Sequence, residues 1–228
     1  MGLSTTDLGT AKSGSGMPKT IAPGNHLLKI NSIFLEDFQF IDGAKHLILN
    51  VETKPIEDFE GFMIDKDDES KGHFAGQIGR VKASQYAFAD GETKTGIKIQ
   101  RDRSVMIFLQ NLCKTLGINE WFVAQDGLHE TIDDLVAAFN KTAKFQDHYL
   151  EFCIAGKEYV GKTGYTNYDM YLPKSEKGKY AYGEVEAGKV MFYSEATHLR
   201  KAEVKEVKGF GDDVFTVPSK TSSDFSLD

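Results

Sequence analysis

The sequence predicts a mainly β (α+β) protein: a small antiparallel β-barrel with a two-helix insertion and flexible N- and C-terminal tails. Six segments alternate apolar and polar residues with the period of two that half-buried strands require. Two segments of helical periodicity separate the fourth strand from the fifth. The 22 glycines, 16 phenylalanines and nine tyrosines suit a fold rich in strands and turns. We expect strands at residues 24–41, 44–53, 76–89, 93–99, 148–155 and 164–172.

Composition divides the chain into three parts. Residues 1–20 are rich in Gly, Ser and Thr, which predicts a flexible N-terminal arm. Residues 21–208 carry the strand and helix patterns and form one domain of ordinary size. Residues 209–228 hold four aspartates against the single Lys220, which predicts a flexible acidic C-terminal tail.

The first two strands form a hairpin, because Asp42-Gly43 between them is a dipeptide typical of tight turns. Residues 55–71 then form an acidic loop. Its acids from Asp65 onward resemble the start of a calcium loop, but Ser70 stands at position six, where that loop requires glycine. We interpret residues 55–71 as a solvated loop that keeps stray anions away from a nearby groove.

Positive charge is concentrated in the next stretch, although the whole chain carries a net charge of −7. The strand at 76–89 places two cations and then two aromatic rings on one face. Cations for phosphates and flat rings for bases are what a platform for single-stranded nucleic acid requires. The alternative, that the rings belong to the core and the cations to a solvated strand end, is equally compatible with the residues. The side chains on this face are Arg80, Lys82, Ser84, Tyr86 and Phe88, and the return strand adds Lys94 and Lys98.

Two helices form the insertion. In the first, apolar residues recur at helical spacing from Val105 to Leu116, and Gly117 is the expected stop. In the second, Thr131 is the expected N-cap, with Asp134 three residues later. We interpret both apolar stripes as core.

Residues Gly156–Thr163 match the phosphate-loop pattern G-x-x-x-x-G-K-[ST]. Such a loop needs a helix that begins at its lysine and points its N-terminus at the phosphates. The run 165–172 is instead β-branched and aromatic and is followed by Pro173, which predicts a strand. We therefore predict a β-hairpin here and keep a phosphate-loop NTPase as an alternative function. A last strand is expected near residues 189–194.

No pattern of a catalytic or metal site is legible, so we expect no enzyme activity, catalytic residue, metal or cofactor. The six histidines lack the spacing of metal ligands, and no nucleophile–His–acid set or close carboxylate pair occurs. Cys113 and Cys153 lie in apolar patterns and predict buried thiols in a reducing compartment. No apolar run approaches ~18 residues, so we expect no membrane association and a cytoplasmic location, in the host cell if the protein is viral.

Three features carry a resemblance that spans roughly residues 20–228. They are the opening PGNHLLKI at 23–30 with LILNVE at 47–52, the late hairpin from Lys157 to Pro173, and the acidic tail with an aromatic residue and a leucine near its end. In these features the chain resembles phage-type single-stranded DNA-binding proteins, which have an OB-fold barrel and an acidic C-terminal tail. The resemblance implies an OB-like fold and a non-catalytic protein that coats and protects single-stranded DNA during DNA replication or recombination.

By this resemblance, the DNA lies across the barrel face. Phosphate contacts are then expected from Arg80, Lys82, Lys94, Lys98 and Arg101, and stacking from Tyr86, Phe88, Tyr165 and Tyr168. Docking of a replication partner is expected at Asp224, Phe225, Leu227 and Asp228, although this tail ends in Asp where the family has Phe. A structural or assembly protein with the same barrel is a further alternative.

The tail predicts a salt-dependent effect on binding. A flexible anionic segment tethered beside a basic groove competes with DNA at an effective concentration on the order of millimolar. Its charge of about −4, terminal carboxylate included, is screened beyond ~8 Å at physiological ionic strength, so the competition is modest. Deleting residues 209–228 should tighten oligonucleotide binding at low salt, with a gain that shrinks as salt rises. Equal affinities of the full-length and truncated proteins at low salt would mean that the tail does not act on the groove.

Overall fold

The computed structural model describes residues 20–53, 77–142, 145, 147–161, 165–202, 204–206 and 216–218. The predicted N-terminal arm (but for Thr20), the acidic loop and the docking residues of the tail therefore lie outside the described residues. Within the described part, no helix is both long enough and apolar enough to cross a membrane.

Strands precede and follow a helical insertion, as predicted, but the described part of this insertion has three helices instead of two, the additional one being the short helix Asn119–Val123. The first strands are β1 (Gly24–Asp37), β2 (Lys45–Thr53), β3 (Ile78–Lys82), β4 (Gly91–Glu92) and β5 (Lys98–Ile99). The helices α1 (Arg101–Thr115), α2 (Asn119–Val123) and α3 (Ile132–Lys141) come next. The chain continues with β6 (Tyr149–Val160), β7 (Thr166–Tyr171), β8 (Tyr182–Glu184), α4 (Glu195–His198), β9 (Leu199–Arg200), β10 (Val204–Glu206) and β11 (Thr216–Pro218).

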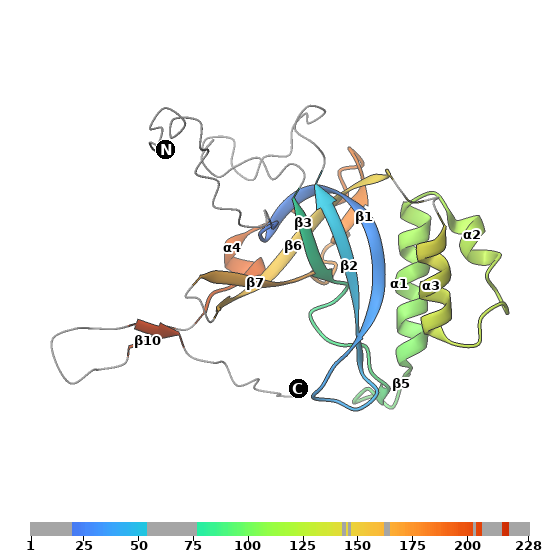
Figure 1. Ribbon diagram of the computed structural model, residues 1–228, viewed down its shortest axis with the longest axis horizontal. Coiled ribbons are helices and arrows are strands. Elements are labelled where there is room, and N and C mark those ends of the chain that lie inside the picture. The colour runs from blue at the N-terminus through green and yellow to red at the C-terminus, as the bar shows by residue number, and fades with distance from the viewer. Residues whose placement is uncertain are drawn as a thin grey trace, which may run out of the picture.

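The central feature is a closed five-stranded barrel. The strands are hydrogen-bonded in the order β1-β2-β3-β7-β6, and β6 pairs back with β1. Neighbours are antiparallel except β3 and β7, which run parallel with Lys82 opposite Tyr171. Strands β8 and β9 pair with β6 outside the ring. The predicted OB-like barrel is thus present, and α1–α3 stand together beside β1 (Figure 1).

The core follows from the two periodicities that the sequence carries. Alternate residues of β1 and β2 fill the barrel, and the apolar stripes of α1 and α3 close over one side of it. The predicted N-cap is confirmed, since the Thr131 hydroxyl oxygen accepts the Asp134 N–H (3.1 Å). Gly117 ends the first helix region with a left-handed φ of 70°. The largest fully buried side chains include Leu28, Ile33, Leu47, Leu49, Leu109, Leu112, Phe139 and Phe152.

One side chain fastens the helical layer to the barrel. Asn140 of α3 accepts the backbone N–H of Ile33 at 2.8 Å and donates to the carbonyl oxygen of the same residue at 2.6 Å. Both bonds reach β1 from a residue 107 positions away. The helical insertion is therefore held to β1 by polar contacts as well as by its apolar stripe.

Several predicted strands have different limits. β1 ends at Asp37 instead of residue 41, and β3 ends at Lys82 because the chain bends over residues 83–86. A strand was expected at 93–99 as the return partner of 76–89. Instead, β4 and β5 pair with each other in a separate ladder of two residues each. The last strand expected near 189–194 is wrong. Only Val190 forms a bridge there, with Tyr180, and the chain then turns away.

Gly156 gives a test of barrel closure. It lies in β6 where a Cβ would overlap the ring of Pro23, which immediately precedes β1. Gly156→Ala should therefore push β1 away from β6 and lower the free energy of unfolding by about 1–3 kcal/mol, the usual cost of overpacking. Gly91→Ala is the matched control, because nothing lies within 4 Å of its added Cβ. Urea denaturation measures both, and equal unfolding midpoints of the two variants would contradict the proposed overlap.

Candidate nucleic-acid interface

The outer face of β3 and β7 brings two of the predicted cations together. Lys82 of β3 donates to the Asp169 carboxylate of β7 at 2.7 Å. Arg80, two residues earlier, pairs with Glu36 of β1 at 3.1 Å, and its guanidinium lies over the Phe34 ring at 5.2 Å. The Arg80 side chain remains 59% exposed. Both cations are thus available at the surface, each with an acid as its present partner.

Apolar and neutral groups form the floor beneath these charges. Register places Phe34, Ile48 and Lys82 in one row across β1, β2 and β3, and Ile48 is buried. His46, two residues along β2, is also buried and packs edge-on against Phe38, with ring centroids 5.1 Å apart. Burial, helped by the Lys82 charge, lowers the pKa of His46, so its ring is neutral at neutral pH.

The β6–β7 hairpin extends this face with tyrosine rings. Tyr159 of β6 lies opposite Asn167 of β7, which is on the side of Asp169 and Tyr171. Tyr165, two residues before Asn167, continues the same side by strand alternation. Tyr159 and Tyr165 are 50% and 61% exposed, so both rings are open to solvent and free to stack.

Tyr168 lies on the other side of β7. It is opposite Glu158 and packs against the core, and burial, reinforced by the Glu158 and Glu195 carboxylates, raises the pKa of its hydroxyl. The prediction grouped Tyr168 with Tyr165, but the alternation of a strand places residues three apart on opposite faces. Tyr168 therefore does not join the face that carries Lys82.

The bend after β3 separates the two aromatic residues predicted to share its face. Tyr86 is 68% exposed, whereas Phe88 packs against the core and its backbone pairs with Lys45 of β2. Arg200 of β9 lies close by. With the Gln85 amide oxygen turned toward it, the Arg200 guanidinium donates two hydrogen bonds of 2.9 and 3.2 Å. Phe88 thus fits the core interpretation, and Tyr86 stays available for stacking.

The remaining predicted cations lie at a different place. Lys94 and Lys98 belong to the β4–β5 segment, which lies beyond the barrel near the start of α1 (Figure 1). Arg101 begins α1, where its guanidinium donates to Asp102 (2.7 Å) and to the Gly43 carbonyl (2.8 Å). The hydrogen bond to Asp102 raises the pKa of Arg101. Arg101 thereby ties α1 to the loop between β1 and β2 and is separate from the β3–β7 face.

The phosphate-loop pattern forms the predicted hairpin. Gly156 lies inside β6, opposite Met170 of β7, and Gly161 follows the end of β6. An added Cβ at Gly161 would lie 2.7 Å from the Asn167 amide nitrogen. Residues 162–164 lie outside the described part, but β7 begins at Thr166, where a phosphate loop would continue as a helix. Close packing explains both glycines, since Gly156 lies against Pro23 outside the hairpin and Gly161 lies against Asn167 within it.

Sequence reasoning missed three members of this face. Phe34, Tyr159 and Arg200 were not among the predicted contacts. Tyr159 carried a usable signal. It shares a strand face with Lys157, two residues earlier, and would have been found had the predicted strand been extended to Val160. Arg200 carried none, since its position depends on the pairing of β9 with β6, more than 40 residues earlier.

The described residues also bear on metal and thiol chemistry. Within them, no three His, Cys, Asp or Glu side chains gather as metal ligands would. Cys113 and Cys153 are buried and unbridged, and burial raises the pKa of each thiol to about 12. Comparison of the chain with protein-family models, with curated proteins and with solved structures found no match.

Proposed function

We propose that this protein binds single-stranded DNA across the outer face of β3, β7 and β6 and protects it during replication or recombination, with no chemistry of its own. One observation carries the proposal. Tyr159 and Tyr165 are at least half exposed on the same side of the β6–β7 hairpin as the acid that holds Lys82. Rings that accept bases and cations that track phosphates are thus combined on one sheet face.

The ion pairs on this face fit a binding surface that must also be stable when empty. Glu36 and Asp169 neutralise Arg80 and Lys82 on this face, near the buried Ile48. The Arg80–Glu36 pair is exposed, and pairs of that kind contribute only about 0–1 kcal/mol, so a phosphate can replace Glu36 at low cost. The Lys82–Asp169 pair is partly buried, with the Lys82 side chain 23% exposed, so its exchange costs more. An arriving strand would then exchange one anionic partner for another.

A cytoplasmic location and a replication partner complete the proposal. The two unbridged, buried thiols agree with a reducing compartment, the host cytoplasm if the protein is viral. The acidic tail, with Phe225 and Leu227, would contact a replication protein while the barrel holds the DNA.

The cations should govern the salt dependence of binding. With about 0.7 counterions released per neutralised phosphate, the Arg80→Ala/Lys82→Ala double variant should lower the log–log salt slope by roughly 1.4. The loss should be the same for all DNA sequences, because phosphates carry no sequence information. Lys141→Ala, an exposed lysine at the end of α3, is the matched control. A folded double variant with an unchanged slope would place the DNA elsewhere.

The rings should govern affinity without changing the slope. Tyr159→Ala and Tyr165→Ala should each weaken binding of a labelled oligonucleotide by about 5- to 150-fold, the range for one stacked base. The salt slope should stay constant, since neither change removes a charge. Phe192→Ala serves as the control, because Phe192 is 81% exposed in the segment after β8. If the wild type binds no single strand at all, the proposal fails and a structural or assembly role is favoured.

A further inference from the structure

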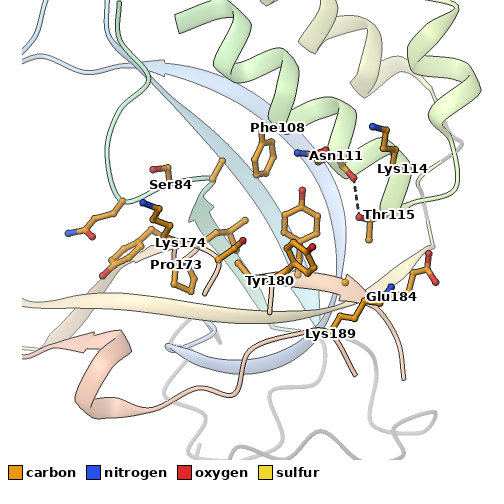
Figure 2. Close-up of a pocket in the computed structure, with 18 of the residues that line it drawn as sticks. Ser84, Phe108, Asn111, Lys114, Thr115, Pro173, Lys174, Tyr180, Glu184 and Lys189 are labelled. Carbon is orange, nitrogen blue, oxygen red and sulfur yellow. Dashed lines mark hydrogen bonds between the residues drawn. The ribbon is translucent and has the colours of Figure 1, made fainter. Parts of the chain in front are cut away.

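A hollow in the surface lies next to the proposed DNA face. It is a groove of about 680 Å³ between α1, the bend at 83–86 and the segment that runs from the end of β7 past β8. Its volume falls within the range of ~300–1,000 Å³ typical of ligand pockets. Figure 2 shows Phe108 and Asn111 projecting from α1 into this space, with Tyr180 on the opposite wall. The proposed DNA face does not use this groove except at its rim.

Aromatic rings line the groove, and two of them pack against neighbouring rings. Phe108 of α1 packs against Tyr182 of β8, with ring centroids 5.8 Å apart. Tyr182 stacks in turn on Phe152 of the core, also at 5.8 Å. Tyr180 is 50% exposed, and its backbone is anchored on both sides, to Lys189 and to Met191. Preformed rings of this kind offer flat surfaces to a base at little cost in ordering.

The net charge of the described residues that line the groove is positive. Lys114, Lys174 and Lys189 line it, while Glu184 is the single acid among its described lining residues. Within the described part of the chain, no carboxylate forms an ion pair with any of these lysines. This differs from Arg80 and Lys82, whose carboxylate partners occupy them on the sheet face. An anionic ligand would meet three available cations here.

The groove adjoins the proposed DNA face. Tyr171 lies opposite Lys82 in the parallel β3–β7 ladder and also lines the groove. Tyr86, exposed at the bend after β3, lines it as well. A strand that leaves the Arg80 and Lys82 face past Tyr86 therefore enters a groove with the same combination of rings and cations.

We propose that this groove continues the DNA path and takes the bases and phosphates of the next one or two nucleotides of the bound strand. The inference rests on the proposed function, and it adds a second subsite with its own cations. The sheet face holds the strand by exchanging ion pairs, whereas the groove holds it with lysines that need no exchange. Binding should therefore strengthen in a step when an oligonucleotide becomes long enough to reach the groove.

A length series tests this step. Oligothymidylates of about 4–16 nucleotides span the site sizes of single barrels of this type. For the longer oligonucleotides, Tyr180→Ala should weaken binding by about 5- to 150-fold. The Lys114→Ala/Lys174→Ala/Lys189→Ala variant should lower the salt slope by about 0.7–1.4, the contribution of the one or two phosphates held in the groove. Neither variant should affect the shortest oligonucleotides that still bind, because these occupy the sheet face alone. Phe192→Ala and Lys141→Ala are the matched controls, and thermal melting checks that each variant is folded.

A chemical readout on the wild-type protein avoids any effect of substitution on folding. Acylation of lysines, followed by mass spectrometry, should show protection of Lys114, Lys174 and Lys189 by a long oligothymidylate but not by a short one. Lys141 should react equally in all samples.

Each other outcome overturns the inference in a distinguishable way. If the wild type binds DNA but the groove variants show its length dependence unchanged, the groove is not on the path and the proposed function stands. If thymidine monophosphate alone protects the three lysines and a long strand does not, the groove is a site for free nucleotides. If the wild type binds no single strand, both proposals fail together.

Discussion

The structure depends on the ability of β1 to pair along both of its edges. Its first residues pair with β6 and its later residues with β2, and Leu28 and Lys29 have partners on both sides. The register with β2 shifts between Ile30 and Ser32, so that Asn31 is an extra residue in the ladder. A bulge of this kind bends a strand and increases its twist. The bend lets one 14-residue strand serve both neighbours and close the barrel.

Closure also determines where the proposed binding surfaces lie. Once β1 joins β2 to β6, the other edges of these strands can meet only through β3 and β7, and that junction is short. It consists of the Lys82–Tyr171 pair and the hydrogen bond from the Leu172 N–H to the Lys82 carbonyl (2.8 Å). Immediately beyond it the chain leaves both strands, and the groove opens there. The face and the groove therefore lie on either side of the β3–β7 junction, which has the fewest paired residues of the five strand pairings in the barrel.

Local patterns predicted most of the elements correctly. The Thr131 cap, the stop at Gly117 and the turn at Asp42-Gly43 all depend on residues within one turn of each other, and all three are present. The end of β3 could not be predicted, because residues 83–89 continue to alternate as a strand would. At this point the Leu172 N–H donates to the Lys82 carbonyl and the Ala83 N–H donates to the Leu47 carbonyl, contacts with distant parts of the sequence.

The residues of the candidate site also differ in whether local sequence patterns could predict their positions. Strand alternation alone was sufficient to place Arg80 and Lys82 on one face. The register between β6 and β7 was needed to decide on which faces Tyr165 and Tyr168 lie. The groove required still more, since its walls come from α1 and from segments about 60–80 residues later, and neither wall carries a recognisable motif.

The phosphate-loop pattern illustrates the converse case, in which a local motif has a purely tertiary cause. A short pattern of glycines records only that the backbone needs room, and it does not say what fills that room. At Gly156 the neighbour is the ring of Pro23, and at Gly161 it is the Asn167 amide, which also donates to the Tyr165 carbonyl (3.0 Å). Both neighbours belong to the protein itself. The glycines therefore serve the closure of the barrel and the hairpin that presents Tyr159 and Tyr165, so the motif contributes to the proposed DNA face through packing alone.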